Sequence, residues 1–474
     1  MRIIVLLLSI IAAAWPQAGR ASRVENGLLP AVLIKGRPGE MKLADRMRHY
    51  KVPGVSVAVI DGGRVEWARG YGLLEAGGAA PVTPETRFQA ASISKPVAAM
   101  GALALVEQGK LDLDEDVNRK LVSWKVPENE LTKEKKVTLR GLLSHGAGLT
   151  VHGFRGYAAG EDVPTLVQAL DGQKPANSAA VRVDILPGSK WRYAGGGYNV
   201  MQQLMIDVTG KKFPDLMREL VLGKLGMTQS TYEQPLPQAL AAVAASGHRG
   251  SGEPIKGKWH TYPEMAAAGL WTTPTDLARF AVELQQAYAG KSSKVISPQM
   301  AAQMLRTQLA PSGLGIVVNA ETQRFEHGGA NEGFRCQLVG YLGKGQGAVV
   351  MTNGDRGGAL VSEILRGVAR EYGWPDYRTE ERALAEVNPE IYGTYSGEYK
   401  TNFTITVTAE SGRLYLQAPP LGPERVELFP ESETGFFTLS ENIKITFVKD
   451  ERGAVKELIA QPPGGQALKA AKVK

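Results

Sequence analysis

Residues 98–106 limit most strongly what this chain can fold into, because they predict a helix that is apolar on every side. A helix without a polar face is stable only in the interior of a sizeable domain. The chain has 474 residues, of which 43% are hydrophobic and 22% are charged. It is therefore long and apolar enough to supply such an interior, and its composition excludes a disordered or fibrous protein.

Strand patterns stand on both sides of a helical region. Two alternating runs in residues 55–71 flank a Gly-containing turn and predict a β-hairpin. Residues 140–290 predict helices joined by Gly and Pro loops, and one of these helices starts at Thr273, which is followed by a proline. Strand patterns return at 334–342 and 347–352. Strands at both ends of a domain imply a mixed sheet whose terminal segments pair, which is an α+β arrangement.

The C-terminal part of the chain has a different pattern. Charged residues concentrate in the segment 376–390, which predicts a connector helix or a linker. From residue 391 to 474 the pattern is of strands alone, and short strands at this spacing predict an antiparallel barrel or sandwich. The expected strands are 403–408, 414–417, 426–429, 443–447 and 455–459.

The N-terminus has the pattern of an export signal. Arg2 precedes an apolar run that ends at Trp15, and small residues follow near Ala21. The run is too short to cross a bilayer, so it predicts a signal peptide over residues 1–21 and a periplasmic or secreted protein. No later stretch is long and apolar enough to predict a transmembrane segment in the mature protein.

Cysteine content and charge argue against a disulfide-stabilised protein and against a nucleic-acid-binding protein. The single cysteine, Cys336, allows no intramolecular disulfide, and we expect it to be a small buried hydrophobe. The net charge of +7 is spread along the chain without a long Lys/Arg run. A nucleic-acid-binding protein would cluster that charge, so we expect no nucleic acid partner.

A serine and a lysine stand at the entrance of the apolar helix. Ser92 and Lys95 are three residues apart, so on a helix they share one face. Burial favours the neutral form of a lysine, and a neutral amine can take the proton of a serine hydroxyl. A Ser-x-x-Lys pattern can arise by chance, but this one is unique in the chain and lies where a hairpin gives way to a buried helix. The pair predicts nucleophilic catalysis.

Two glycine-rich segments follow. Tyr193 is presented just before three consecutive glycines that begin at Gly195, and a phenol near a lysine can carry a proton to a leaving group. The segment from His327 to Ala330 runs into the strand pattern at 334–342. Glycine at a strand edge admits a substrate closely, and a backbone N–H there can face an oxyanion.

These three ordered segments together resemble the serine β-lactamase and penicillin-binding-protein superfamily. The resemblance covers about residues 40–370 and is closest to class C β-lactamases, D-alanyl-D-alanine carboxypeptidases, D-aminopeptidases and family VIII carboxylesterases. Stretches 142–149, 268–278 and 327–334 support it. It implies an α+β domain of the β-lactamase/transpeptidase type, with an antiparallel sheet and a mainly helical insertion, followed by a small lipocalin-like all-β barrel. The expected limits are a signal peptide at 1–21, a hydrolase domain at 22–375, a linker at 376–390 and the barrel domain at 391–474.

The resemblance also assigns roles to single residues. Ser92 would be the nucleophile, Lys95 its proton acceptor and Tyr193 the proton donor to the leaving atom. The backbone N–H groups of Ser92 and Ala330 would form the oxyanion hole, with His327, Gly329 and Gly195 beside the substrate.

The chain departs from the family pattern at three of these positions. His327 and Gly328 stand where the family usually has Lys and Thr or Ser, and Gly195 replaces an Asn whose amide grips an acylamino side chain. The resemblance therefore implies poor binding of β-lactams. It favours a serine hydrolase of short esters or D-amino-acid peptides and amides, whose substrate is a small molecule or a peptide, cell-wall peptides included.

Other functions remain open at this point. A class C-like β-lactamase or a D-alanyl-D-alanine carboxypeptidase is the nearest alternative, and a catalytically weak penicillin-binding or sensor protein is an alternative outside enzymology. No serine has the Gly-x-Ser-x-Gly surroundings of an α/β-hydrolase. The nearest histidine pair, His145 and His152, lacks the spacing of zinc ligands, so we expect neither a metal nor a cofactor.

Overall fold

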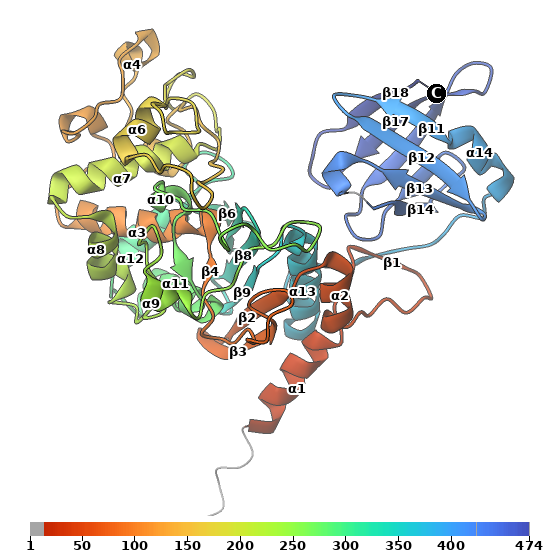
Figure 1. Ribbon diagram of the computed structural model, residues 1–474, viewed down its shortest axis with the longest axis horizontal. Coiled ribbons are helices and arrows are strands. Elements are labelled where there is room, and N and C mark those ends of the chain that lie inside the picture. Colours follow the sequence, from red (N-terminus) through yellow and green to blue (C-terminus); the bar gives the residue numbers. More distant parts are fainter. Residues whose placement is uncertain (1–13, 423, 474) are drawn as a thin grey trace, which may run out of the picture. The chain divides into compact units, whose positions relative to one another are not determined.

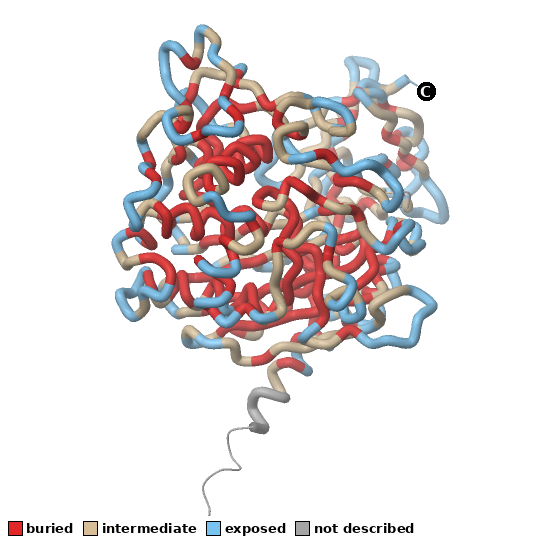
Figure 2. The backbone as a smooth tube through the Cα atoms, turned by 60° about the vertical axis from the view of Figure 1, so that its left-hand side comes forward, coloured by how far each residue is buried: buried red, intermediate tan, exposed pale blue. Residues whose placement is uncertain are grey.

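The computed structural model describes residues 14–422 and 424–473. The chain divides into two units, one made of residues 47–361 together with the N-terminal segment up to residue 18, the other of residues 19–46 and 362–474. Buried backbone, red in Figure 2, follows the strands and the central helices, whereas exposed segments are concentrated in loops.

The first unit is built on a six-stranded sheet with the strand order β3-β2-β9-β8-β7-β6 (Figure 1). The hairpin predicted at 55–71 is confirmed as β2 and β3, and the late strands are confirmed as β8 and β9. Each pairing in the sheet is antiparallel, as the family resemblance implied and unlike the mixed sheet expected from the strand pattern. The strands are β2 (Gly54–Asp61), β3 (Arg64–Gly72), β6 (Val317–Asn319), β7 (Arg324–Asn331), β8 (Phe334–Tyr341) and β9 (Gln346–Thr352).

β2 and β9 join the two ends of this unit. Val55 lies opposite Thr352 and Ile60 lies opposite Gly347, so the terminal strands pair as expected. Both strands are buried along almost their whole length, which is why their sequences are apolar runs. α11 (Pro274–Tyr288) packs against the sheet and begins, as predicted, at the capping residue Thr273, whose hydroxyl accepts from the N–H of Asp276.

The helical part lies between β3 and β6 in the sequence. The apolar helix is confirmed as α3 (Ser94–Glu107), and its residues from Ser94 to Leu105 are all buried. α7 (Gly195–Thr209) and α10 (Met265–Ala268) contact each other and α3. The further helices are α4 (Glu130–Glu134), α5 (Leu139–Leu143), α6 (Leu166–Asp171), α8 (Phe213–Met217), α9 (Gln238–Ala241) and α12 (Pro298–Leu305), and a two-stranded sheet pairs β4 (Phe88–Gln89) with β5 (Trp271–Thr272).

In the second unit, eight strands among the described residues close into a barrel. Closure is made by β11 and β18, where Tyr399 pairs with Lys472. Aromatic side chains fill the interior, and Tyr395 stacks on Phe447 with ring centroids 4.5 Å apart. The strands are β11 (Gly397–Lys400), β12 (Thr404–Glu410), β13 (Arg413–Gln417), β14 (Val426–Pro430), β15 (Gly435–Phe437), β16 (Lys444–Lys449), β17 (Val455–Gln461) and β18 (Leu468–Lys472).

The five C-terminal strands expected from the sequence are confirmed, and three more are present. β11, β15 and β18 were missed because they are short and carry few apolar residues in alternation. Of the two alternatives for 376–390, a connector helix or a linker, the structure contains no helix at Glu380–Arg382, which forms β10 and pairs in parallel with β1 (Val32–Ile34). Local charge pattern cannot reveal a partner strand that lies more than 300 residues away in the sequence.

Three further helices are α1 (Ala14–Glu25), α2 (Leu43–Tyr50) and α13 (Gly357–Tyr372). The second unit also contains the short helix α14 (Tyr392–Tyr395). Residues 1–13 of the predicted signal peptide lie outside the described residues, and its remaining part belongs to α1. Among the described residues, no helix combines the length and the apolar character needed to cross a membrane.

Candidate active site

Ser92 and Lys95 are in direct contact. A short 3₁₀ turn (Ala91–Ile93) leads into α3, and Lys95 Nζ donates to Ser92 Oγ at 3.0 Å. The same nitrogen donates to the carbonyl oxygen of Ala267 in α10 at 2.8 Å. Lys95 is 2% exposed, whereas Ser92 is only half-buried. The amine is thus held in one position beneath a hydroxyl that a substrate can reach.

The backbone before Ser92 is held in an uncommon conformation. Ala91 has φ 49°, a left-handed value that costs energy for a residue with a side chain. Ser94 stabilises the turn, because its hydroxyl donates to Ala91 O at 2.5 Å and accepts from Leu270 N at 2.9 Å. The buried Tyr232 hydroxyl donates to Ser94 O at 2.7 Å. These bonds fix the direction in which Ser92 projects.

Tyr193 lies over the same amine. Its ring centroid is 4.9 Å from Lys95 Nζ, and the His145 ring packs on its face with centroids 4.4 Å apart. His145 is buried, and this burial, with the charge of Lys95 close by, holds the pKa of His145 well below its ordinary value. The neutral ring accepts a hydrogen bond from Ala194 N at 3.1 Å through Nδ1, which fixes the residue after Tyr193. His145 is therefore a positioning residue for Tyr193.

β7 brings a second histidine, His327, to the site. The ring of His327 lies 6.2 Å from that of Tyr193, and its Nδ1 is 2.7 Å from Gly328 O. Burial and the neighbouring Lys95 lower the pKa of His327 to about 4. The side chain is therefore neutral at physiological pH and cannot provide the positive charge of a lysine in that place.

The glycine at 329 is required by close packing of β7 on the nucleophile segment. A Cβ at this position would lie 2.3 Å from Ala90 O and 2.4 Å from Cys336 Sγ. Cys336 is buried, as expected, and burial raises the pKa of its thiol well above the ordinary value. Ala330, the next residue, is exposed. β7 thus passes directly beside the segment that carries Ser92, with Ala330 on the open side.

Gly195 is the buried first residue of α7, and its N–H donates to His152 O at 3.0 Å. His152 is exposed, and its ring lies 4.9 Å from the Tyr193 ring. The residues predicted for the site therefore share one region of the first unit. In the described part of the chain, no group of three His, Cys, Asp or Glu side chains is arranged to hold a metal ion.

Sequence reasoning missed several groups that the structure brings to this site. The oxygen of Ala267 is a backbone atom and gives no sequence signal. Ser94 lies inside the Ser-x-x-Lys pattern and His145 inside the stretch 142–149, but neither pattern by itself gives these residues a role at the site. Outside this set of groups, a buried carboxyl, Glu264, comes directly before α10, and burial raises its pKa to about 7.

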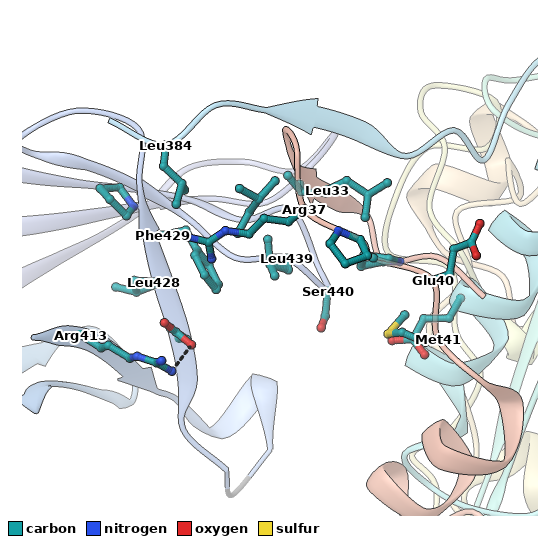
Figure 3. Close-up of a pocket in the computed structure, with 18 of the residues that line it drawn as sticks. Leu33, Arg37, Glu40, Met41, Leu384, Arg413, Leu428, Phe429, Leu439 and Ser440 are labelled. Atoms are coloured by element: carbon teal, nitrogen blue, oxygen red, sulfur yellow. Dashed lines mark hydrogen bonds and ion pairs between the residues drawn. The ribbon is translucent and has the colours of Figure 1, made fainter. Parts of the chain in front are cut away.

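A cavity of about 610 Å³ in the second unit has a different character (Figure 3). Its wall mixes apolar side chains, such as Leu33, Leu384 and Phe429, with charged ones. Two ion pairs lie in it, Arg413–Glu427 at 3.5 Å and Arg46–Glu363 at 2.7 Å. Ser440 is the serine in this wall, and neither lysine nor histidine is among the described residues that line it. The wall therefore offers no activated nucleophile.

Known structures and proteins resemble large parts of the chain. The solved structure of the octameric penicillin-binding protein homologue from Pyrococcus abyssi superposes with a TM-score of 0.59 and 20% identity, covering 91% of this chain and 98% of that one. Penicillin-binding protein 4* of Bacillus subtilis (strain 168) is 23% identical over 439 residues, which are 87% of this chain and 93% of that protein. Esterase EstB of Burkholderia gladioli is 26% identical over 216 residues, which are 44% of this chain and 54% of the esterase.

The fold defines a serine hydrolase of the β-lactamase type. The family model described as Beta-lactamase matches residues 41–370, and the chain belongs to this family. A second model, a domain of unknown function (DUF3471), matches residues 381–471, which cover the barrel except for the last residue of β18. The family resemblance and the fold class expected from the sequence are confirmed.

Proposed function

We propose that this protein hydrolyses an ester or an amide through an acyl-enzyme formed on Ser92. The observation that carries the proposal is the 3.0 Å contact between Lys95 Nζ and Ser92 Oγ, with the amine anchored on Ala267 O. A fixed amine within hydrogen-bond distance of a reachable hydroxyl is the arrangement that activates a serine.

The reaction proceeds in two halves. The Lys95 amine takes the proton of Ser92, Oγ bonds to the substrate carbonyl carbon, and the carbonyl oxygen becomes an oxyanion held by the N–H groups of Ser92 and Ala330. The bond to the leaving oxygen or nitrogen then breaks, and that atom receives a proton from the Tyr193 hydroxyl, which regains one from the protonated Lys95 amine. Water repeats the sequence on the ester, so Ser92 is regenerated and the acid is released.

The β7 residues beside Tyr193, His327 and Gly328, support a substrate class. A neutral His327 gives a substrate carboxylate no ionic partner at neutral pH, and Gly328 offers no hydroxyl. Charge-assisted hydrogen bonds are worth about 1.5–3 kcal/mol each, so their absence weakens β-lactam binding substantially. Short esters and D-amino-acid amides need neither bond, and we infer that these are the substrates.

The test begins with a fluorophosphonate probe, which rapidly labels only an activated serine. The purified protein should be labelled on the Ser92 peptide, and it should hydrolyse p-nitrophenyl esters or D-amino-acid amides faster than nitrocefin. Slow labelling would favour a sensor or binding protein on the same fold. Efficient nitrocefin turnover would favour a β-lactamase.

We also propose export and the domain limits expected from the sequence. Export predicts that the protein recovered from the periplasm or medium lacks residues 1–21, which N-terminal sequencing measures. The limits 22–375 and 391–474 predict that limited proteolysis cuts first within 376–390.

A further inference from the structure

The wall beside Tyr193 is formed by the segment 150–154, which packs directly on the first turn of α7. His152 O accepts from Gly195 N and Val151 O accepts from Gly196 N, both at 3.0 Å. The N–H groups of a first helical turn normally have no partner within the helix, and they form an attractive site for an anion. In this protein two of them already have carbonyl partners. The helix start is therefore closed to a substrate carboxylate.

The same packing crowds position 195. A Cβ on Gly195 would lie 2.9 Å from Phe154 Cε2 and 3.1 Å from His152 O. A Cβ on Gly196 would lie 2.7 Å from Thr150 O. The closest atom to a Cβ on Gly195 is therefore at the end of the Phe154 side chain, and this ring would have to move to admit a side chain there. The space into which a polar side chain from position 195 would project is occupied by the edge of the Phe154 ring.

The surface so formed is aromatic. Phe154 is half-buried against the core, and the exposed His152 ring lies 4.9 Å from the ring of Tyr193. Tyr193 precedes Gly195 by two residues, so this surface adjoins the place where an acyl group on Ser92 must lie. Such a surface gains from apolar contact and offers an amide no side-chain hydrogen bond from position 195.

From this packing we propose that Phe154 determines acyl specificity, and that the enzyme selects plain apolar acyl groups, such as phenylacetyl or butyryl, over acyl groups that carry an acylamino substituent. This inference rests on the proposed function and specifies its substrate class. The closure of Gly195 by Phe154 and His152 is the feature that carries it.

The experiment compares kcat/KM for matched p-nitrophenyl esters of phenylacetic acid, acetic acid and N-acetylglycine. The wild type should prefer the phenylacetyl ester to the N-acetylglycyl ester by at least tenfold. Phe154→Ala should reduce the phenylacetyl-to-acetyl ratio by about tenfold, since a lost apolar contact of this size is worth roughly 10–200-fold in discrimination. Phe154→Leu keeps an apolar side chain and should give an intermediate ratio, which guards against misfolding of the alanine variant. Phe403→Ala, which removes a half-buried phenylalanine from the barrel, is the matched control and should leave the ratio unchanged.

A second comparison tests the space itself. Gly195→Asn alone should lower activity on every ester, whereas Phe154→Ala combined with Gly195→Asn should recover activity and raise the N-acetylglycyl share. Rapid labelling of Ser92 together with ratios that do not respond to Phe154 would overturn this inference and leave the proposed function standing. Absence of Ser92 labelling in the wild type would overturn both.

Discussion

The two sides of the active site are built by different means. On the side that carries Ser92, hydrogen bonds join Lys95 to Ser92 and to Ala267 O, and Ser94 to Ala91 O. The backbone at Ala91 is kept in a strained conformation. On the recognition side, β7 and the segment 150–154 contribute glycines, a neutral histidine and an aromatic ring, with close packing in place of charge.

This difference assigns the chemical step to one side of the site and the choice of substrate to the other. A hydrogen-bonded nucleophile loses its function when one partner is removed, because its reactivity depends on direction and proton transfer. A packed wall changes what is accepted, because shape and apolar contact discriminate by smaller amounts. Mutations on the nucleophile side should therefore change rates far more than those on the recognition side.

The largest expected effect is the loss of Ser92. Ser92→Ala removes the atom that forms the acyl-enzyme, so turnover and probe labelling should both disappear while the circular dichroism spectrum is retained. Mass spectrometry of the wild type should place the acyl group on the Ser92 peptide. Labelling of another serine would refute the assignment.

Removal of the proton-transfer partners should follow. Lys95→Ala and Tyr193→Phe should each lower kcat/KM by about 10²–10⁴, the usual range for a general acid or base. The double variant should lose less than the product of the two, because the residues act together on one proton path. Steady-state kinetics on a p-nitrophenyl ester measures this, and near-wild-type activity for Lys95→Ala would contradict the mechanism.

Glu264 provides a test on stability. Burial raises the pKa of its carboxyl from an ordinary 4.5 to about 7. Below pH 4.5 Glu264 is protonated in both the folded and the unfolded state, so its ionisation does not lower the free energy of unfolding there. Between pH 4.5 and 7 only the unfolded state ionises, so the free energy of unfolding should fall by about 3 kcal/mol and then level off.

Glu264→Gln is the matched variant for this measurement, since it keeps the size of the side chain and removes the ionisation. Urea unfolding of both proteins at pH 5 and pH 8 should show a clearly smaller loss for the glutamine variant. Equal losses in the two proteins would show that Glu264 does not titrate in this range.

The smallest effect is expected at His327. Because its pKa is lowered to about 4, the ring should stay neutral from pH 8 down to about pH 5. Nitrocefin binding should therefore not improve over that range, and His327→Gln should show the same flat profile. A KM for nitrocefin that falls several-fold between pH 7.5 and 6 in the wild type alone would indicate a protonated His327. It would contradict a recognition side that works without charge.

The sequence predicts the nucleophile side better than the recognition side. The pattern around Ser92, the tyrosine before three glycines and the histidine on a late strand lead to side chains that the structure brings together. Phe154 could not be found in this way, because its importance lies in a contact with Gly195 that depends on how a loop folds back. The oxygen of Ala267 carries no residue signature at all.

The fold was predictable for a similar reason. Long apolar strands such as β2 and a helix such as α3 are predicted to be buried from their own residues alone. The short strands β10 and β15 are defined by their partners, and three residues in alternation are too few to distinguish a strand from a loop.

The pairing of β2 with β9 also bears on how the chain reaches its native state. Val55 has Thr352 as its neighbour, so the centre of the sheet forms only after nearly 300 intervening residues have been synthesised. Pairings of such high sequence separation close slowly, and until then an unpaired apolar strand is open to aggregation. A nascent chain that stops before residue 346 lacks the central strand of its sheet, so it should remain dependent on chaperones however well its helices have formed.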